Sequence, residues 1–252
     1  MMIYRRCFIP ARGRLLNLPF AVLGVTVLSS WIAAPPSHAD VSASPAGQVI
    51  PATDSNIRYV NRFDTRGSAG PRCEWSASTV TLRFTGSSLG AKIGDTGDGD
   101  AYEVTVDNNA PTVLTLQKGT SDYTLFSDPN SEPSHQSHII TLVKRTEAFV
   151  GTTQFFSFTL PTGEKLLAPP KPGKYRLEVI GDSITCGYGD EAASKDEHFT
   201  PATENADAAY GVLAARAFGA DYSIVAWSGR KMWPDNTTPS IYDLALPTDP
   251  TS

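Results

Sequence analysis

Ser183 stands where the nucleophile of an acyl-transfer reaction would be expected. Residues 181–189 read Gly-Asp-Ser-Ile-Thr-Cys-Gly-Tyr-Gly and follow the segment 175–180, which is predicted to be a strand. A serine hydroxyl is a weak nucleophile until a base takes its proton. At the carboxyl edge of an α/β sheet, however, it faces the place where such sheets bind ligands, and backbone N–H groups there can stabilise an oxyanion. The pattern predicts Ser183 as a nucleophile; a serine that only caps a helix is the alternative.

The sequence offers no residue that we predict as the base for Ser183. His198 follows the serine turn and is predicted to be a solvated loop residue. The other histidines are His38, in the N-terminal segment, and His135 and His138, in a β-rich region. Three acids that follow Ser183 are predicted to be loop charges rather than a base, namely Asp190, Glu191 and Glu204.

The segments that would position Ser183 change character near residue 165. Residues 56–165 hold short runs of alternating apolar and polar residues separated by Gly, Pro and Asn, which is typical of a β-sandwich. The predicted strands are residues 79–84, 102–107, 112–116, 123–126, 138–143 and 155–160. A proline-rich joint at 161–172 then separates this all-β domain from the C-terminal region.

After the joint, the pattern predicts a strand at 175–180, an amphipathic helix at 205–218 and a strand at 222–227. Strand, helix and strand in this order begin a parallel α/β sheet. A doubly wound sheet needs about five strands, but only a short Pro-, Thr- and Asp-rich segment follows Gly229. We therefore expect residues 174–252 to be the first part of an incomplete α/β domain, and the chain to be a fragment.

The serine motif also resembles a known family. Gly181-Asp182-Ser183-Ile184-Thr185, with Gly187 and Gly189 after it, resembles the first motif of the GDSL-type, or SGNH, esterases. It lacks the Gly-x-Ser-x-Gly elbow of the α/β-hydrolases. With Lys144-Arg145-Thr146-Glu147 and Phe155-Phe156-Ser157-Phe158 before the joint, the chain is similar to the family 2 carbohydrate esterases. That resemblance implies a jelly-roll-like β-sandwich followed by a flavodoxin-like SGNH domain, and removal of acetyl groups from xylan and related polysaccharides.

The resemblance implies roles for three residues. Ser183 would be the nucleophile, the backbone N–H groups of Ser183 and Gly229 would donate to the oxyanion, and Asp182 would brace the loop. The family's remaining motifs, an Asn for the oxyanion hole and an Asp-x-x-His for the base, are not found, and we do not assign Asn236 to the hole. We therefore expect a C-terminally truncated esterase with little or no turnover, whose substrate is acetylated plant cell-wall polysaccharide and which needs no cofactor.

Several other features leave alternatives open. Lys144-Arg145-Thr146-Glu147 is predicted to be either an exposed, charged strand end or part of a domain interface. Residues 94–100 have the composition of a calcium loop but lack the EF-hand spacing, so we favour a plain turn and predict no metal site. Cys73 and Cys186 lie in different predicted domains, so a disulfide between them is the less favoured alternative.

The N-terminus has the features of an export signal. Basic residues precede the apolar stretch 15–34, and Ser37-His38-Ala39 offers a cleavage site. We expect a signal peptide at 1–39, a linker at 40–55, a secreted or periplasmic protein and no stable membrane association after cleavage. An N-terminal membrane anchor is the alternative.

Composition narrows the possible functions. The formal net charge is −5, and the sequence has no clustered basic stretch, which argues against nucleic-acid binding. Two rivals to the deacetylase hypothesis remain, a general GDSL-type esterase or lipase and a non-catalytic carbohydrate-binding sandwich. The aromatic residues that could stack on sugars in such a sandwich are Trp75, Tyr102 and Tyr123.

Overall fold

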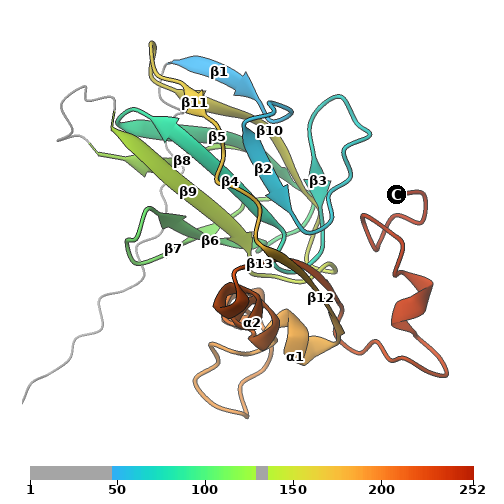
Figure 1. The fold of residues 1–252 in the computed structure, drawn as a ribbon. Helices are drawn as coiled ribbons and strands as arrows, with labels where there is room; N and C mark the ends of the chain where they lie inside the picture. The colour runs from blue at the N-terminus through green and yellow to red at the C-terminus, as the bar shows by residue number, and fades with distance from the viewer. Residues whose placement is uncertain (1–46, 129–135) are drawn as a thin grey trace, which may run out of the picture. The chain divides into compact units, whose positions relative to one another are not determined.

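The computed structural model describes residues 47–128 and 136–252. The predicted signal peptide at 1–39 and His135 lie outside the described residues. Within them the chain is mostly β-sheet with few helices (Figure 1). The coarse prediction from the sequence, a long β-rich region followed by a short α/β region, agrees with this content.

The β-rich region forms two antiparallel sheets. The first has the strand order β1–β10–β5–β8, and β3 also pairs with β10. Its strands are β1 (Gln48–Pro51), β3 (Arg72–Cys73), β5 (Ser88–Asp95), β8 (Gly119–Ser127) and β10 (Thr153–Leu160). The second has the order β11–β4–β9–β6–β7, and β2 also pairs with β4. Its strands are β2 (Ile57–Val60), β4 (Thr79–Thr85), β6 (Ala101–Val106), β7 (Thr112–Thr115), β9 (Ser137–Lys144) and β11 (Leu166–Leu167).

The two sheets share one hydrophobic core. Phe84 of β4 and Ile140 of β9 are buried in the same cluster as Ile93 of β5 and Phe158 of β10. Every second residue of an antiparallel strand points to the same face, so the alternating segments each contribute one row to this core. The six strands predicted in this region are confirmed, with ends that differ by a few residues.

Strand β5 was not predicted. It is a central strand between β10 and β8, and nearly all of its residues are buried, so the polar and apolar alternation of a half-exposed strand is missing. Gly94 also stands where a Cβ would lie 2.9 Å from the ring of Phe156. Gln48–Pro51, which we predicted to belong to the linker, is instead strand β1, because it pairs with Ser157–Leu160 of β10.

The third sheet consists of two parallel strands, β12 (Tyr175–Gly181) and β13 (Ala220–Ala226). Between them lie helix α1 (Ser183–Cys186), a 3₁₀ turn (Pro201–Thr203) and helix α2 (Tyr210–Phe218), and a second 3₁₀ turn (Thr238–Ser240) follows β13. Helix α2 packs on the two strands, and Val212 of α2 shares a buried cluster with Ile224 of β13. The predicted helix at 205–218 therefore begins five residues late, because a turn at 206–208 precedes it.

Side chains from the β-rich region hold this small sheet in place. Asn61, which follows β2, accepts a hydrogen bond from the backbone N–H of Ile224 at 3.2 Å and donates to the carbonyl of Ser76 at 2.8 Å. The indole N–H of Trp75 donates to the carbonyl of Leu244 at 3.1 Å. The parallel strands thus gain from residues of the β-rich region the contacts that two strands alone cannot supply.

Candidate active site

Ser183 is the first residue of helix α1, directly after the last strand residue and the helix cap (Figure 1). Asp182 is the N-cap, and its side chain accepts a hydrogen bond from the N–H of Ile184 at 3.2 Å. Ser183 is half-buried, whereas Ile184 beside it is 72% exposed. The serine is therefore held at a strand end and remains open to a ligand from outside.

Two glycines are required around this turn. A Cβ on Gly181 would lie 1.9 Å from Oγ1 of Thr185, and that hydroxyl is fixed by a 2.8 Å hydrogen bond with the hydroxyl of Tyr210. Gly187 caps α1 in the left-handed region at φ 79°, and a Cβ there would lie 2.3 Å from the carbonyl oxygen of Asn205. Side chains at these positions would push the serine turn away from β12 and α2.

Gly229 lies at the same edge of the sheet as Ser183. Gly181 and Ala226 are paired at the carboxyl ends of the parallel strands β12 and β13. The segments that begin at Asp182 and Trp227 therefore start next to each other. Gly229 has a φ of 75°, and its carbonyl oxygen accepts a hydrogen bond from the side chain of Asn236 at 3.0 Å. Within the described residues, the backbone N–H groups of Ser183 and Gly229 make no hydrogen bond to the protein. Both are therefore free to bind an acceptor.

A buried carboxylate holds the segment that carries Gly229. Glu147 is fully buried, and its two oxygens accept the N–H of Ser228 at 2.7 Å and the hydroxyl of Ser228 at 2.5 Å. Lys144, Arg145 and Thr146 are buried as well, so the segment is no exposed strand end. Instead it lies where the β-rich region meets the residues around α1, α2 and β13.

The two basic residues of this segment are neutralised by buried acids. Nζ of Lys144 donates to Asp100 at 2.5 Å and to the hydroxyl of Thr146 at 3.0 Å. Arg145 donates to Glu103 at 2.6 Å and also forms an ion pair with Glu191. Burying such an ion pair costs desolvation free energy. Removing only one partner destabilises the fold much more, because the other charge is then left buried and unpaired.

Glu204 corrects one prediction from the sequence. We predicted a loop charge, but its side chain is fully buried, and its Oε2 accepts the backbone N–H of Glu147 at 3.0 Å. Burial, followed by the nearby charge of Glu147, raises the pKa of Glu204 well above its usual range. Oε1 of Glu204 has no hydrogen-bond partner among the described residues. Burial therefore favours the protonated form of this carboxyl group.

The same two carboxyl groups and the thiol of Cys186 offer atoms within 4.8 Å of one another. Both oxygens of Glu147 already accept hydrogen bonds from Ser228, and burial raises the pKa of the Cys186 thiol. These three side chains therefore form a hydrogen-bonded cluster rather than a set of free metal ligands. Cys73 and Cys186 are both free and buried, so they are not joined by a disulfide.

Glu204→Gln should flatten the dependence of stability on pH. A carboxyl group whose pKa is raised by folding binds its proton more tightly in the folded state than in the unfolded state. Its contribution to the free energy of unfolding is therefore full below the unfolded pKa of about 4.3, and it is lost as the pH rises toward the folded pKa. The wild-type melting temperature should therefore fall more steeply than that of the variant between about pH 5 and pH 9. Thermal unfolding followed by circular dichroism measures this. The exposed Glu197→Gln is the control, and equal slopes for all three proteins would contradict the prediction.

Two histidines lie among the described residues. His138 is buried in β9, and its Nδ1 shares a 2.8 Å hydrogen bond with Asp107. His198 is an exposed loop residue, as predicted. Asp190 is exposed as well, and Glu191 forms an ion pair with Arg145. None of these contacts joins a base to Ser183, so we assign to the described residues a candidate nucleophile and two candidate oxyanion donors.

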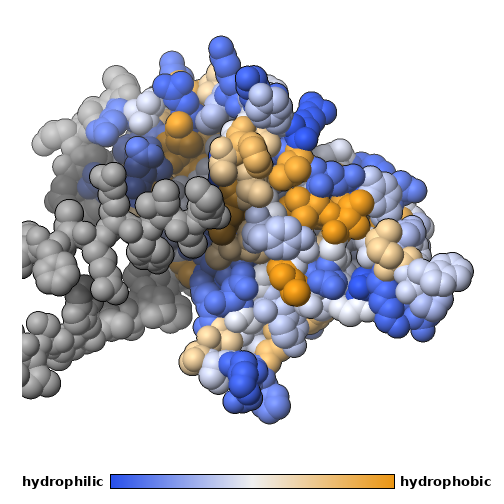
Figure 2. Space-filling model, turned by 60° about the horizontal axis from the view of Figure 1, so that its bottom comes forward, coloured by the Kyte–Doolittle hydropathy of each residue, from blue (hydrophilic) through white to orange (hydrophobic). Residues whose placement is uncertain are grey.

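The proposed sugar-stacking aromatics are buried in the protein. Trp75 and Tyr102 are fully buried and Tyr123 nearly so, which removes them as platforms for a polysaccharide. Apolar side chains do reach the surface on the face that carries α1 and α2 (Figure 2). The exposed large apolar residues of these two helices are Ile184, Phe218, Tyr210 and Leu213.

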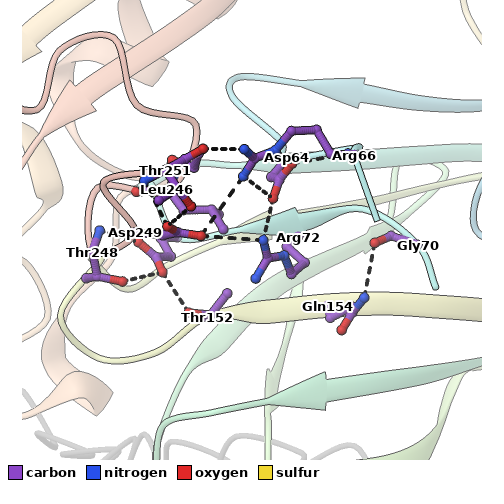
Figure 3. A network of polar contacts seen from close by, with 12 residues as sticks. Asp64, Arg66, Gly70, Arg72, Thr152, Gln154, Leu246, Thr248, Asp249 and Thr251 are labelled. Carbon is purple, nitrogen blue, oxygen red and sulfur yellow. Dashed lines mark hydrogen bonds and ion pairs between the residues drawn. The ribbon is translucent and has the colours of Figure 1, made fainter. Parts of the chain in front are cut away.

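The segment after the site is tied back to the first sheet. Glu74 accepts the N–H of Thr248 at 2.9 Å and its hydroxyl at 2.5 Å, and also the hydroxyl of Thr152 at 2.7 Å. Figure 3 shows the neighbouring ion pairs, in which Arg72 lies 3.7 Å from Asp249. These contacts fix the chain beyond Gly229. No helix among the described residues is long and apolar enough to cross a membrane.

Comparison with protein families gives a match over the β-rich region. Residues 59–170 match the model described as "Carbohydrate esterase 2 N-terminal". The cellulase/esterase CelE of Acetivibrio thermocellus is 40% identical over 173 residues, covering 69% of this chain and 20% of that protein. An acetylxylan esterase / glucomannan deacetylase of Cellvibrio japonicus is 35% identical over 182 residues, covering 68% of this chain and 48% of that protein.

Solved structures give the same picture. A family two carbohydrate esterase from Clostridium thermocellum in complex with cellohexaose is 36% identical with a TM-score of 0.70, over 77% of this chain and 59% of that one. A family two carbohydrate esterase from Cellvibrio japonicus is 26% identical with a TM-score of 0.72, over 79% of this chain and 60% of that one. The chain spans half or less of the curated relatives named above and about 60% of these solved chains.

Proposed function

The chain belongs to carbohydrate esterase family 2, and from that premise we propose that it carries the nucleophile and oxyanion hole of a polysaccharide acetyl esterase. The observation that carries the proposal is the pairing of Ser183 with Gly229. Both follow adjacent parallel strands, and both keep a backbone N–H free of protein partners within the described residues.

The fold fits this proposal in its order of parts. The two antiparallel sheets correspond to the jelly-roll-like sandwich expected at 56–165, and β12, α1, α2 and β13 correspond to the beginning of an SGNH domain from 174 onward. Export of the protein, by the signal predicted at 1–39, would bring it to an extracellular or periplasmic substrate. Relatives named as acetylxylan esterases and glucomannan deacetylases support acetylated plant cell-wall polysaccharide as that substrate.

In the proposed reaction, Oγ of Ser183 attacks the carbonyl carbon of an acetyl ester. The N–H groups of Ser183 and Gly229 stabilise the negative charge that develops on the carbonyl oxygen. The sugar hydroxyl leaves with a proton, and water then releases acetate from the acetyl-serine. Asp182 would brace the turn by accepting the N–H of Ile184 rather than act as the acid of a triad. We assign no base for the serine proton among the described residues, and we therefore propose low turnover for this chain by itself.

Acyl-chain preference tests the proposed substrate class. Imidazole supplied in solution can replace the missing base, and the 252-residue chain should then hydrolyse 4-nitrophenyl acetate faster than the octanoate ester. Release of acetate from acetylated xylan, measured with an acetate-specific assay, should also depend on imidazole. A preference for the octanoate would favour the general esterase or lipase. Retention on insoluble xylan with no acetate release under any condition would favour a non-catalytic binding module.

A further inference from the structure

Glu147 contacts the residue before Gly229 and a residue of the helix that begins at Ser183. Its carboxylate accepts two hydrogen bonds from Ser228, the residue before Gly229. The thiol of Cys186, in the same four-residue helix as Ser183, donates to Oε2 of Glu147 at 3.8 Å. One buried side chain from the end of β9 thus lies between the serine turn and the segment that carries Gly229.

We propose that Glu147 is a positioning residue that sets the place and orientation of the Gly229 N–H relative to Ser183; the inference rests on the proposed esterase function. A carboxylate that accepts both the N–H and the hydroxyl of one residue fixes that residue's backbone as well as its side chain. It also occupies the N–H of Ser228, which leaves the N–H of Gly229 as the donor that this segment offers.

The surroundings of Glu147 suit a positioning role and exclude direct contact with the substrate. The side chain is fully buried, and both of its oxygens are occupied by donors. Glu204, whose pKa is raised by burial and by the charge of Glu147, accepts the backbone N–H of Glu147 at 3.0 Å. The carboxylate is therefore neutralised by hydrogen bonds and stays behind the site.

The chain contains a matched control for this carboxylate. Glu74 is equally buried and accepts both the N–H and the hydroxyl of Thr248, in the segment that is tied back to the first sheet. Glu147→Gln and Glu74→Gln therefore remove the same charge from the same kind of contact. They differ in which segment is released.

Amide hydrogen exchange on the 252-residue chain reads the positioning directly. In Glu147→Gln the amide of Ser228, which bonds to Glu147 in the wild type, should exchange at least about tenfold faster, whereas Glu74→Gln should speed exchange at Thr248 and leave Ser228 unchanged. Ser228→Ala, which removes the hydroxyl bond and keeps the N–H bond, should give a smaller increase at residue 228. It also serves as the test if Glu147→Gln does not fold. Unchanged exchange at residue 228 in both variants would overturn the proposal.

Imidazole-supported hydrolysis of 4-nitrophenyl acetate gives the functional result. Because a displacement of about 1 Å at a reacting group can cost 100-fold, Glu147→Gln should lower kcat on the order of 10- to 100-fold with little change in KM, while Glu74→Gln should match the wild type. Equal kcat in the two variants would overturn the positioning role. If Ser183→Ala hydrolysed the ester as fast as the wild type, the proposed function would be overturned instead. The hydrogen-exchange result would then still test whether Glu147 fixes the backbone at Ser228.

Discussion

Ser183→Ala should abolish the part of 4-nitrophenyl acetate hydrolysis that imidazole supports, while changing the imidazole-free rate of this chain by less than about twofold. The two halves of this result have one cause. In a serine hydrolase the nucleophile and its base act as a unit, so removing the serine costs little more once the base is missing. The remaining rate then comes from the oxyanion donors and from binding, on the order of 10³-fold over water.

In any form of the protein that presents a histidine to Ser183, the loss should grow to the order of 10⁶ in kcat. The effect is measured from initial rates of hydrolysis at several imidazole concentrations. In Ser183→Ala, the slope of the rate against imidazole concentration should fall to the value measured without enzyme. Ser194→Ala, at an exposed loop position, is the control and should keep the wild-type slope. An imidazole slope that survives Ser183→Ala would show that another group is the nucleophile.

Lys144→Met should lower the free energy of unfolding by about 3–5 kcal/mol, which is a large part of the stability of an ordinary domain. Nζ of Lys144 is fully buried and donates to Asp100 and to Thr146. Without the ammonium group, the carboxylate of Asp100 would remain buried close to Asp95. Oδ2 of each aspartate already has no hydrogen-bond partner among the described residues. Burial and the charge of Asp100 raise the pKa of Asp95 to about 7, which shows how little solvation this place offers.

Urea unfolding at neutral pH, followed by tryptophan fluorescence, measures this loss. Lys195→Met is the matched control, because Lys195 is 88% exposed and its ion pair with Asp196 should contribute less than about 1 kcal/mol. The double variant Lys144→Met/Asp100→Asn should regain part of the lost stability, since the unpaired buried charge is removed with its partner. A loss for Lys144→Met no larger than for Lys195→Met would mean that the Lys144–Asp100 pair does not support the fold.

The serine turn could be predicted from the sequence because its causes are local. The apolar run before Gly181, the serine two residues later and the glycine at 187 specify a strand, a tight turn and a short helix within about a dozen residues. The same holds for the alternating strands, whose period of two follows from the pleat itself. Strand β5 escaped prediction because its central place buries both of its faces, and a strand buried on both faces does not alternate.

The roles of Glu147, Glu204 and Lys144 were decided only by the tertiary structure. Glu147 meets Ser228 across 81 residues, Glu204 meets Glu147 across 57, and Lys144 meets Asp100 across 44. A charged residue in a sequence is expected at the surface unless a partner accompanies it into the interior, and no local pattern reveals a partner so far along the chain. The residues around Gly181 were therefore enough to predict a candidate nucleophile, because their interactions are local. The contact of the buried carboxylate of Glu147 with Ser228 follows only from the packing of the β-rich region against the serine turn.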